Sequence, residues 1–376
     1  MSNYILVSAN YPPHIGGVER YSQKIASELV ARGNHVVVLT SSFEGQSECE
    51  RPSENLEIIR LPSLWFLDDR MPVLRQTKRW REVRRKLCSI ENPRMIIQTF
   101  LYPLSYAAAR LARQKKWPFI VINHGCNYVC QGDQLVDRIE HVYEEILSRM
   151  VVKGSKGCYA VSQAAGEWAK HFSLPFSGVL NNAIDVEETI QKIGRSPVDV
   201  RAKYEISKNA IVVSYVGRMI QEKGIKQLIE AVQKMQEEGR DIILLAVGDG
   251  PMLDELKKQQ SDRIIFTGSV EHDDVLQLLQ ASNCCCLPSD SEGFPTVLLE
   301  AALCKSFLIG SPYGGIPEVI GKHGTVMKGN SCEDIYNALT EFITADTQKI
   351  VNCAFERVKK ELSWSNTCEN IEKLEW

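Results

Sequence analysis

The 376-residue sequence lacks the features that mark membrane-spanning, secreted and general nucleic-acid-binding proteins. It contains no run of about 18 apolar residues, so we expect no membrane-spanning helix. Residues 1–7 contain neither a basic region nor a cleavage site, so we expect no signal peptide. The formal net charge is only −3, which argues against a general nucleic-acid binder.

Cysteine, by contrast, is frequent. The sequence has 12 cysteines, three of them consecutive at residues 284–286, but no pair has the C-x-x-C spacing that is typical of zinc sites. Because no export signal is expected, we predict a reducing, cytoplasmic location. There, most of these cysteines would be free, buried thiols, and we expect neither a disulfide framework nor a zinc site.

The order of apolar segments indicates an α/β fold. Short apolar runs that suit buried strands alternate with stretches of helical spacing, and a polar, less periodic stretch near residues 185–210 interrupts this alternation. The expected strands lie at residues 4–8, 36–39, 95–97, 119–122, 158–161, 178–180, 211–216, 242–247, 264–266, 284–287 and 307–309. Such alternation is typical of mostly parallel sheets that helices cover on both faces.

We therefore predict two doubly wound Rossmann-like domains with a cleft between them. At about 150 residues per domain, the length of the chain allows two to three domains. We place the N-terminal domain at residues 1–190 and the C-terminal domain at residues 191–362. The last segment, residues 363–376, is predicted to be a helix that packs back towards the N-terminal domain.

A basic amphipathic helix is predicted from Val73 to Ile90, where apolar residues recur every three or four positions. Its other face carries seven basic residues, interrupted by Glu82. These are Arg75, Lys78, Arg79, Arg81, Arg84, Arg85 and Lys86. This face either is simply solvated or attracts anionic lipid head groups or a phosphorylated acceptor, at about 1 kcal/mol per basic residue.

Two glycine-containing loops follow predicted strands and could bind an anion. Gly16 and Gly17 lead into the first helix, whose N-terminal amides would suit a phosphate; the alternative is a simple tight turn. Arg218 and Lys223 follow the strand at 211–216, at the sheet edge where open α/β folds bind ligands. A forked guanidinium and a mobile ammonium suit a diphosphate, and the alternative is two solvated cations. Neither loop has the G-x-G-x-x-G or Walker spacing.

Residues 289–301 contain two carboxylates, on a loop and in the helix that follows it. Glu292 lies on the loop, and Glu300 lies in a helix that we expect to begin near Pro295. The loop amides and the helix N-terminus can bind an anionic or hydroxyl-rich ligand. The two carboxylates can accept hydrogen bonds from paired hydroxyls, such as those of a ribose and a sugar. The alternative is a helix-capping carboxylate and a surface glutamate.

Taken together, these segments resemble retaining glycosyltransferases of the GT-B fold, specifically glycosyltransferase family 4. Glu292 and Glu300 match the E-x7-E motif of that family, and further segments follow in the family's order between about residues 4 and 364. They are Gly16-Gly17, Asn123-His124-Gly125, Asn182-Ala183-Ile184-Asp185, Gly217-Arg218, Lys223-Gly224, Gly248-Asp249-Gly250-Pro251 and Gly314-Gly315-Ile316-Pro317-Glu318. One departure is Ala183, where the family often has a glycine that would allow a positive φ.

The resemblance implies a site for a nucleotide-sugar donor. The implied catalytic residues are His124, Arg218, Lys223 and Glu292, and the implied donor-binding residues are Gly16, Gly17, Asn182, Gly293, Phe294, Pro295, Thr296 and Glu300. Arg218 and Lys223 would hold the diphosphate and Glu300 the ribose. Glu292 and the amides of residues 293–295 would hold the transferred sugar. His124 would face that sugar, and a purely structural histidine is the alternative.

No cofactor or metal is expected besides the donor itself, a UDP- or GDP-sugar. The sequence has no D-x-D triplet, and two cations can neutralise a leaving diphosphate without a metal. The resemblance implies a retaining, hexosyltransferase-type enzyme. The basic helix points to a lipid-linked glycan as the acceptor, besides a simple sugar, and we expect a role in bacterial surface polysaccharide or glycolipid synthesis. We expect the protein in the cytoplasm, where the anionic inner face of the membrane would be a further partner. We expect no nucleic acid among its partners.

Three other functions remain open at this stage. A sugar-nucleotide epimerase of the same fold would change its donor without an acceptor. A non-catalytic partner of another transferase would be expected to lose site residues, whereas both glutamates and both cations are present here. A NAD-dependent dehydrogenase is disfavoured because the dinucleotide fingerprint is absent.

Overall fold

The computed structural model describes residues 1–14, 16–43, 45–66, 71–75, 78–126, 128, 134–195 and 199–376, with the backbone alone at 134–137. Its contacts divide the chain into a first unit, residues 1–182 with 364–376, and a second unit, residues 183–363. The division precedes the 190/191 boundary of the sequence analysis because helix α6 (Val186–Ile193) packs on helices of the second unit. No described helix is both long enough and apolar enough to cross a membrane.

The first unit is built on a nine-stranded sheet in the order β3-β4-β2-β1-β6-β7-β8-β9, with β5 paired to β4. The strands are β1 (Asn3–Ser8), β2 (His35–Ser42), β3 (Cys49–Ser53), β4 (Leu56–Phe66), β5 (Met71–Leu74), β6 (Arg94–Gln98), β7 (Phe119–Asn123), β8 (Gly157–Ala160) and β9 (Phe176–Val179). The helices are α1 (Gly17–Ala31), α2 (Lys78–Leu87), α3 (Pro103–Lys115), α4 (Gln134–Val152), α5 (Gln163–His171) and α15 (Trp364–Glu372). The pairs are parallel, except that β3 and β5 run antiparallel to β4.

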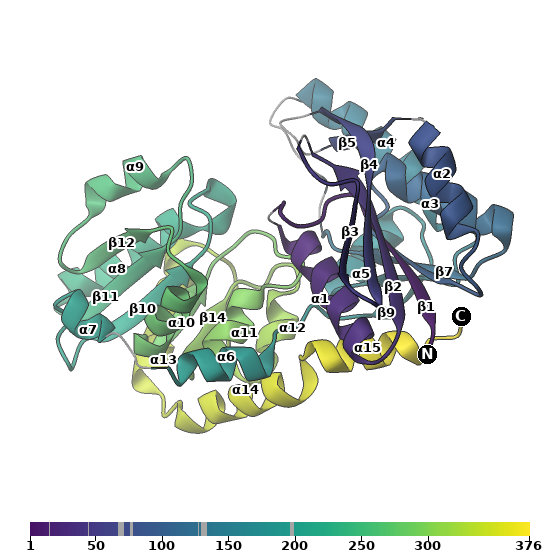
Figure 1. Cartoon of the computed structure of the whole chain (residues 1–376). Coiled ribbons are helices and arrows are strands. Elements are labelled where there is room, and N and C mark those ends of the chain that lie inside the picture. Colours follow the sequence, from purple (N-terminus) through teal and green to yellow (C-terminus); the bar gives the residue numbers. More distant parts are fainter. Residues whose placement is uncertain are drawn as a thin grey trace. The chain divides into compact units, whose positions relative to one another are not determined.

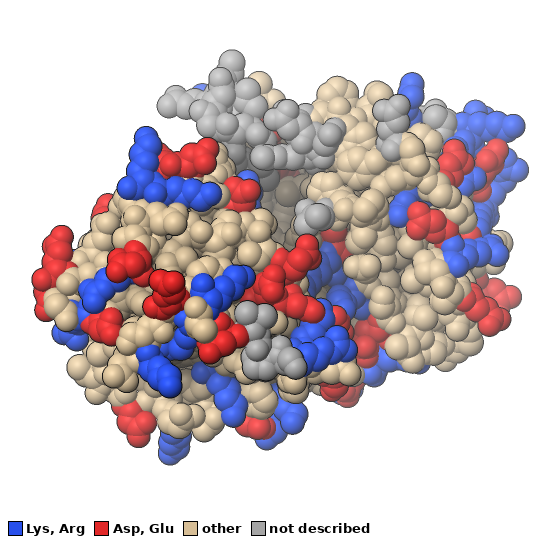
Figure 2. Space-filling view, turned by 60° about the vertical axis from the view of Figure 1, so that its left-hand side comes forward, with Lys and Arg blue, Asp and Glu red and all other residues tan. Residues whose placement is uncertain are grey.

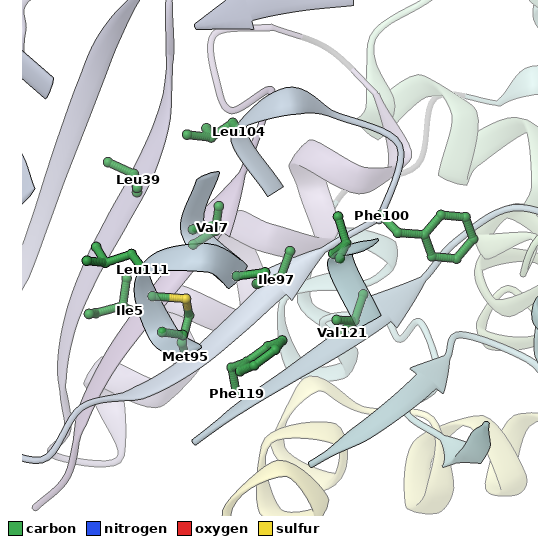
Figure 3. Packing of buried hydrophobic residues seen from close by; sticks show 14 of the residues in the cluster. Ile5, Val7, Leu39, Met95, Ile97, Phe100, Leu104, Leu111, Phe119 and Val121 are labelled. Atoms are coloured by element: carbon green, nitrogen blue, oxygen red, sulfur yellow. The ribbon is translucent and has the colours of Figure 1, made fainter. Parts of the chain in front are cut away.

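Helices cover both faces of this sheet, because alternate strand side chains point to opposite faces. Ile5, Val7, Met95 and Ile97 pack with side chains of α2, α3 and α4 in one buried cluster, part of which Figure 3 shows. On the other face α1 packs against α15, and Figure 1 shows the two helices side by side. The apolar strand runs of the sequence thus form the centre of a three-layered unit.

The second unit has a six-stranded, wholly parallel sheet in the order β12-β11-β10-β13-β14-β15. Its strands are β10 (Ile211–Val216), β11 (Ile242–Val247), β12 (Ile264–Gly268), β13 (Cys284–Leu287), β14 (Phe307–Gly310) and β15 (Gly324–Val326). In addition to α6, its helices are α7 (Val200–Lys203), α8 (Ile225–Glu237), α9 (Leu253–Leu256), α10 (His272–Ala281), α11 (Thr296–Leu303), α12 (Ile316–Ile320), α13 (Cys332–Thr344) and α14 (Gln348–Glu361). Short 3₁₀ turns lie at Gln221–Lys223 and Lys257–Gln259. The three consecutive cysteines of β13 are buried in this sheet, and burial raises the pKa of the Cys285 thiol to about 12.

The prediction of two doubly wound Rossmann-like domains is confirmed, because in both units the strand order reverses beside the first strand. In the first unit β1 lies between β2 and β6, and in the second β10 lies between β11 and β13. Ligands of open α/β sheets bind where the order reverses, outside the carboxyl ends of the strands. The cleft expected between the domains stays a prediction.

The predicted amphipathic helix from Val73 to Ile90 is wrong at both ends. Val73 lies in strand β5, which pairs with β4 through Leu64, and the described helix begins at Lys78 and ends at Leu87. Ile90 follows the helix in a turn, where its amide donates to the Leu87 carbonyl oxygen. The spacing of Val73 fitted the helical pattern by coincidence, since antiparallel pairing with β4 determines its conformation.

Candidate active site

In the second unit, the switch point is the place where the strand order reverses, between β10 and its neighbours. It brings together two loops that lie about seventy positions apart in the sequence. Residues 217–224 follow β10, and residues 288–295 follow its neighbour β13. The Asp290 amide donates to the Glu222 carbonyl oxygen over 2.8 Å, which joins the loops directly. A Cβ atom added at Gly224, where φ is +68°, would overlap the Pro288 carbonyl oxygen. Glycine is therefore required where the two backbones meet.

Lys223 and Glu292 form an ion pair across these loops, between Lys223 Nζ and Glu292 Oε1. Ser289 Oγ lies 3.3 Å from the same carboxylate oxygen and donates to it. The side chains of Lys223 and Glu292 are only 20% and 22% exposed, so the pair is partly shielded from water. The structure thus brings two of the predicted catalytic residues into direct contact.

Arg218 lies on the same loop and is exposed. Among the described residues, none forms an ion pair with its guanidinium, while its carbonyl oxygen accepts a hydrogen bond from Tyr215 over 2.8 Å. Burial, with a smaller contribution from the Glu292 carboxylate, raises the pKa of Tyr215, so its hydroxyl stays a donor. Tyr215 therefore fixes the backbone of the loop and leaves the Arg218 side chain accessible to an anionic ligand.

A third loop, which contains Gly314 and Gly315, packs against the backbone of Glu292. The Gly315 amide donates to the Glu292 carbonyl oxygen over 2.7 Å. A Cβ atom at Gly314, where φ is +59°, would overlap that oxygen, and one at Gly315 would overlap the carbonyl oxygen of Gly293. These glycines fix the backbone of Glu292 and Gly293. The resemblance assigns Glu292 and the amides of residues 293–295 to the sugar, but Pro295 has no N–H to donate, so only Gly293 and Phe294 can act as backbone donors there.

Glu300 lies in α11, which begins at Thr296 with Pro295 as its N-cap residue. The Glu300 side chain is buried and accepts a hydrogen bond from His272 Nε2 over 2.9 Å. Sequence reasoning did not find His272, although it is the first residue of α10, the helix that follows β12. Helices α10 and α11 pack together, so His272 positions the carboxylate that the resemblance assigns to the ribose.

In the first unit, Gly16 is the N-cap residue of α1, and Gly17 is its first residue. A Cβ atom at Gly16 would overlap the side chain of Glu19, whereas one at Gly17 would meet nothing within 4 Å. The buried Glu19 carboxylate also pairs with His14 Nδ1, 2.9 Å away. The amides of this helix N-terminus therefore lie beside a carboxylate, and the assignment of Gly16 and Gly17 to the donor stays a prediction.

His124 follows β7 and is half-buried. Its Nε2 lies 2.7 Å from Oε1 of the fully buried Gln98, at the end of neighbouring β6. Its ring contacts the Tyr21 ring edge-on, with centroids 4.8 Å apart. Thr99, the residue after Gln98, has a φ of +62°, which is strained for a β-branched residue. Gln98 is thus a second site residue that the sequence analysis missed, although it was a polar residue ending an apolar run.

Burial lowers the pKa of His124 from 6.5 to about 3, so the ring is neutral at physiological pH. The pKa of His124 is lower in the folded state than in the unfolded state. The neutral ring therefore makes its full contribution to the free energy of unfolding above pH 6.5, and this contribution decreases as the pH falls. From pH 7 to pH 5, the wild-type chain should lose about 2 kcal/mol more stability than His124→Gln. Urea unfolding of both proteins at the two pH values measures this, and identical pH dependence would contradict it.

Asn182 is the last residue before the second unit, in the segment that follows β9. Tyr21 Oη donates to the Leu180 carbonyl oxygen over 3.1 Å, and Thr367 Oγ1 donates to that of Asn181 over 3.0 Å. Tyr21 therefore links this segment to His124. Ala183 is not among the described residues with a positive φ, so the departure from the family's glycine costs no backbone strain.

No group of three or more potential metal ligands gathers among the residues that the structure describes. The expectation of a metal-independent reaction stays a prediction.

Two family models match the chain in succession. The model described as Glycosyltransferase Family 4 matches residues 15–188, and the model described as Glycosyl transferases group 1 matches residues 199–354. An uncharacterized glycosyltransferase of Methanocaldococcus jannaschii is 25% identical over 98% of this chain and 97% of its own length. A putative teichuronic acid biosynthesis glycosyltransferase of Bacillus subtilis is 29% identical over 66% of this chain and 61% of its own length.

A solved structure shares the whole fold. HepE of Anabaena, determined in complex with UDP, is 16% identical and has a TM-score of 0.73, with 99% of both chains covered. The two family models between them match most of both units, each of which has the doubly wound topology. The chain is therefore a GT-B glycosyltransferase similar to those of family 4.

Proposed function

We propose that this glycosyltransferase is a retaining, hexosyltransferase-type enzyme that moves a sugar from a nucleotide-sugar donor to a hydroxyl acceptor. The observation that carries the proposal is the contact between Lys223 and Glu292 on the loops of the second switch point, beside the accessible Arg218. Two cations and a carboxylate at this place suit the diphosphate and the sugar of one donor molecule. The UDP complex of the structurally similar HepE supports a nucleotide at this fold.

In this proposal each side chain has a separate task. Arg218 and Lys223 neutralise the diphosphate, whose negative charge grows as the glycosidic bond breaks. The ammonium of Lys223 has three N–H donors, so it can hold Glu292 and a phosphate oxygen together. Glu292 and the neighbouring amides hold the sugar, and Glu300, positioned by His272, holds the ribose. Neutral His124 contributes a hydrogen bond and no charge.

A thermal-shift screen of UDP, GDP and ADP tests the proposal without an acceptor. A nucleotide at a hundred times its dissociation constant stabilises a protein by about 2.7 kcal/mol. We expect one of the three to raise the unfolding temperature of the wild-type chain and to shift Arg218→Ala much less. If no nucleotide raises the unfolding temperature, or if Arg218→Ala responds like wild type, the proposed donor site is wrong.

We further propose that the acceptor is a sugar or lipid-linked glycan in surface polysaccharide or glycolipid synthesis. The relative from Bacillus subtilis is named for teichuronic acid biosynthesis, which supports such a pathway. The basic residues of α2 support a contact with anionic lipid. Arg79 pairs with Glu48 and Lys86 with Glu57, whereas the structure gives Arg81 and Arg85 no ion pair with a described residue.

The double variant Arg81→Gln/Arg85→Gln should bind anionic vesicles about 30-fold more weakly, because each basic residue contributes about 1 kcal/mol near such a surface. Lys257→Gln/Lys258→Gln removes two exposed charges from the second unit and serves as the matched control. Co-sedimentation with phosphatidylglycerol vesicles measures binding. Equal binding of both variants, or binding that added salt does not weaken, would contradict an electrostatic role of α2.

A further inference from the structure

Gln98 is a polar residue at the end of strand β6, where the preceding residues Met95, Ile96 and Ile97 are apolar and buried. Gln98 is fully buried as well. In the part of the chain that the structure describes, its side-chain amide forms one hydrogen bond, between Oε1 and Nε2 of His124 over 2.7 Å, while its own Nε2 has no partner. Packing alone would favour an apolar residue here, because a buried donor without a partner costs free energy. The contact with His124 therefore explains the amide.

The sheet holds the backbone of Gln98 on both sides. Gln98 pairs with Ser8 of β1 and with Ile122 of β7. The amide of Thr99 donates to the Ile122 carbonyl oxygen over 2.9 Å, although the φ of Thr99 is +62°. A strained φ persists only where the surrounding structure enforces it, and such strain is concentrated at functional sites. Gln98 thus presents its amide to His124 from a fixed backbone.

This contact determines which nitrogen of His124 carries the hydrogen. The carbonyl oxygen Oε1 of Gln98 can only accept, so Nε2 of His124 donates and carries the N–H. Burial keeps the pKa of His124 at about 3, and the neutral imidazole has a single N–H. Nδ1 of His124 is therefore left with a lone pair, and none of the described residues forms a hydrogen bond with it.

The groups around the ring carry no charge that would change this state. In Figure 2, basic and acidic side chains are spread over the visible surface. The described side chains that contact His124 are instead Gln98 of β6 and Tyr21 of α1. Burial raises the pKa of Tyr21 well above its ordinary value, so this phenol is neutral and its Oη donates to the Leu180 carbonyl oxygen. The lowered pKa of His124 is likewise caused by burial, without a contribution from a charged group.

We propose that Gln98 is a positioning residue that fixes His124 in the Nε2–H tautomer, so that Nδ1 of His124 accepts a hydrogen bond from a hydroxyl of the donor sugar. This inference rests on the function proposed above, in which His124 faces the sugar. A lone pair on Nδ1 selects a group that has a hydrogen to donate, whereas a carboxylate can only accept. The donor sugar therefore presents a hydroxyl to His124, and not the carboxylate of a sugar acid.

Nitrogen-15 NMR of the histidine rings tests the tautomer without a substrate. Protonated and unprotonated ring nitrogens have widely separated shifts, and His124→Gln identifies the His124 signals among those of the seven histidines. We expect a protonated Nε2 and an unprotonated Nδ1 in the wild-type chain at both pH 6 and pH 8. Gln98→Leu should increase the population of the other tautomer, because it removes the acceptor beside Nε2. A protonated Nδ1 in wild type, or an unchanged tautomer population in Gln98→Leu, would overturn the proposal.

Gln98→Glu tests whether the reaction needs the lone pair on Nδ1. A carboxylate beside Nε2 raises the pKa of His124, so the ring takes up a proton on Nδ1 as the pH falls. With a pKa near 7, the neutral fraction of the ring decreases about tenfold between pH 8 and pH 6. We therefore expect kcat/KM for the donor, relative to wild type at the same pH, to fall about tenfold over this range. Gln98→Leu should be impaired about tenfold at both pH values, because it leaves a buried donor unpaired.

The matched control is Gln233→Glu, which makes the same change on α8 of the second unit, where the amide bonds to Gln259. Its kcat/KM relative to wild type should not change with pH, and the same constancy in Gln98→Glu would overturn the proposal. All these variants should keep the nucleotide thermal shift of wild type, because Gln98 lies in the first unit and Gln233 outside the candidate site. Absence of that shift in wild type would refute the donor site instead. The wild-type NMR spectrum decides the tautomer in either case, and also where Gln98→Glu does not fold.

Discussion

Arg218→Ala and Lys223→Ala should each lower kcat by about 10²–10³, the cost of losing one well-placed electrostatic donor in other enzymes. Both residues lie on the loop that follows β10 at the second switch point. Negative charge grows on the leaving diphosphate, so both cations favour the transition state over the bound donor. The loss of donor affinity should therefore be smaller than the loss of kcat. Steady-state transfer, or donor hydrolysis while the acceptor is unknown, measures both quantities.

Two controls sharpen this result. Lys226→Ala removes a lysine three positions away that pairs with Glu255, and it should leave kcat unchanged. Lys223→Arg should not restore full activity, because a planar guanidinium does not replace a compact ammonium beside Glu292. If kcat of both alanine variants stays within a few-fold of wild type, the diphosphate site lies elsewhere.

Changes at the two glutamates should separate donor binding from turnover. Glu300→Ala should raise the KM for the donor by about tenfold or more, because a hydrogen bond to a charged group contributes about 1.5–3 kcal/mol. Glu292→Ala should mainly lower kcat, by about 10², because it holds the sugar that is transferred. The separation is measured by steady-state kinetics on the same donor. Equal effects of both variants on both parameters would contradict the assignment of ribose to one carboxylate and sugar to the other.

The ion pair adds a quantitative test to this prediction. Because Lys223 contacts Glu292, removal of either residue also disturbs the other. The double variant Lys223→Ala/Glu292→Ala should therefore be less impaired than the product of the two single effects. Simple multiplication of the effects on kcat would indicate that the two residues act independently.

Much of the fold could be predicted because its central strands are unbroken apolar runs. The sequence analysis placed β10, β11 and β13 at the residues where the structure has them, since strands buried on both faces consist of consecutive apolar residues. It missed β3, whose five residues include Arg51 and Pro52 and are largely exposed.

The contacts within the candidate site could not be derived in the same way. Lys223 and Glu292 are 69 positions apart and meet only because β10 and β13 are neighbours in the sheet. His272 meets Glu300 because α10 and α11 pack together, and Gln98 meets His124 because β6 and β7 pair. Residue types and loop positions indicated the candidates, whereas strand order determines which candidates touch.

The central claim is that the second unit binds the nucleotide diphosphate of a sugar donor through Arg218 and Glu300. Calorimetric titration of UDP and GDP into the wild-type chain and into Arg218→Ala and Glu300→Ala tests it most directly. The account predicts that wild type binds one of the two nucleotides at a single site and that both variants bind it more weakly, Glu300→Ala by about tenfold or more. Absence of binding to wild type, or binding that neither substitution weakens, would contradict the account.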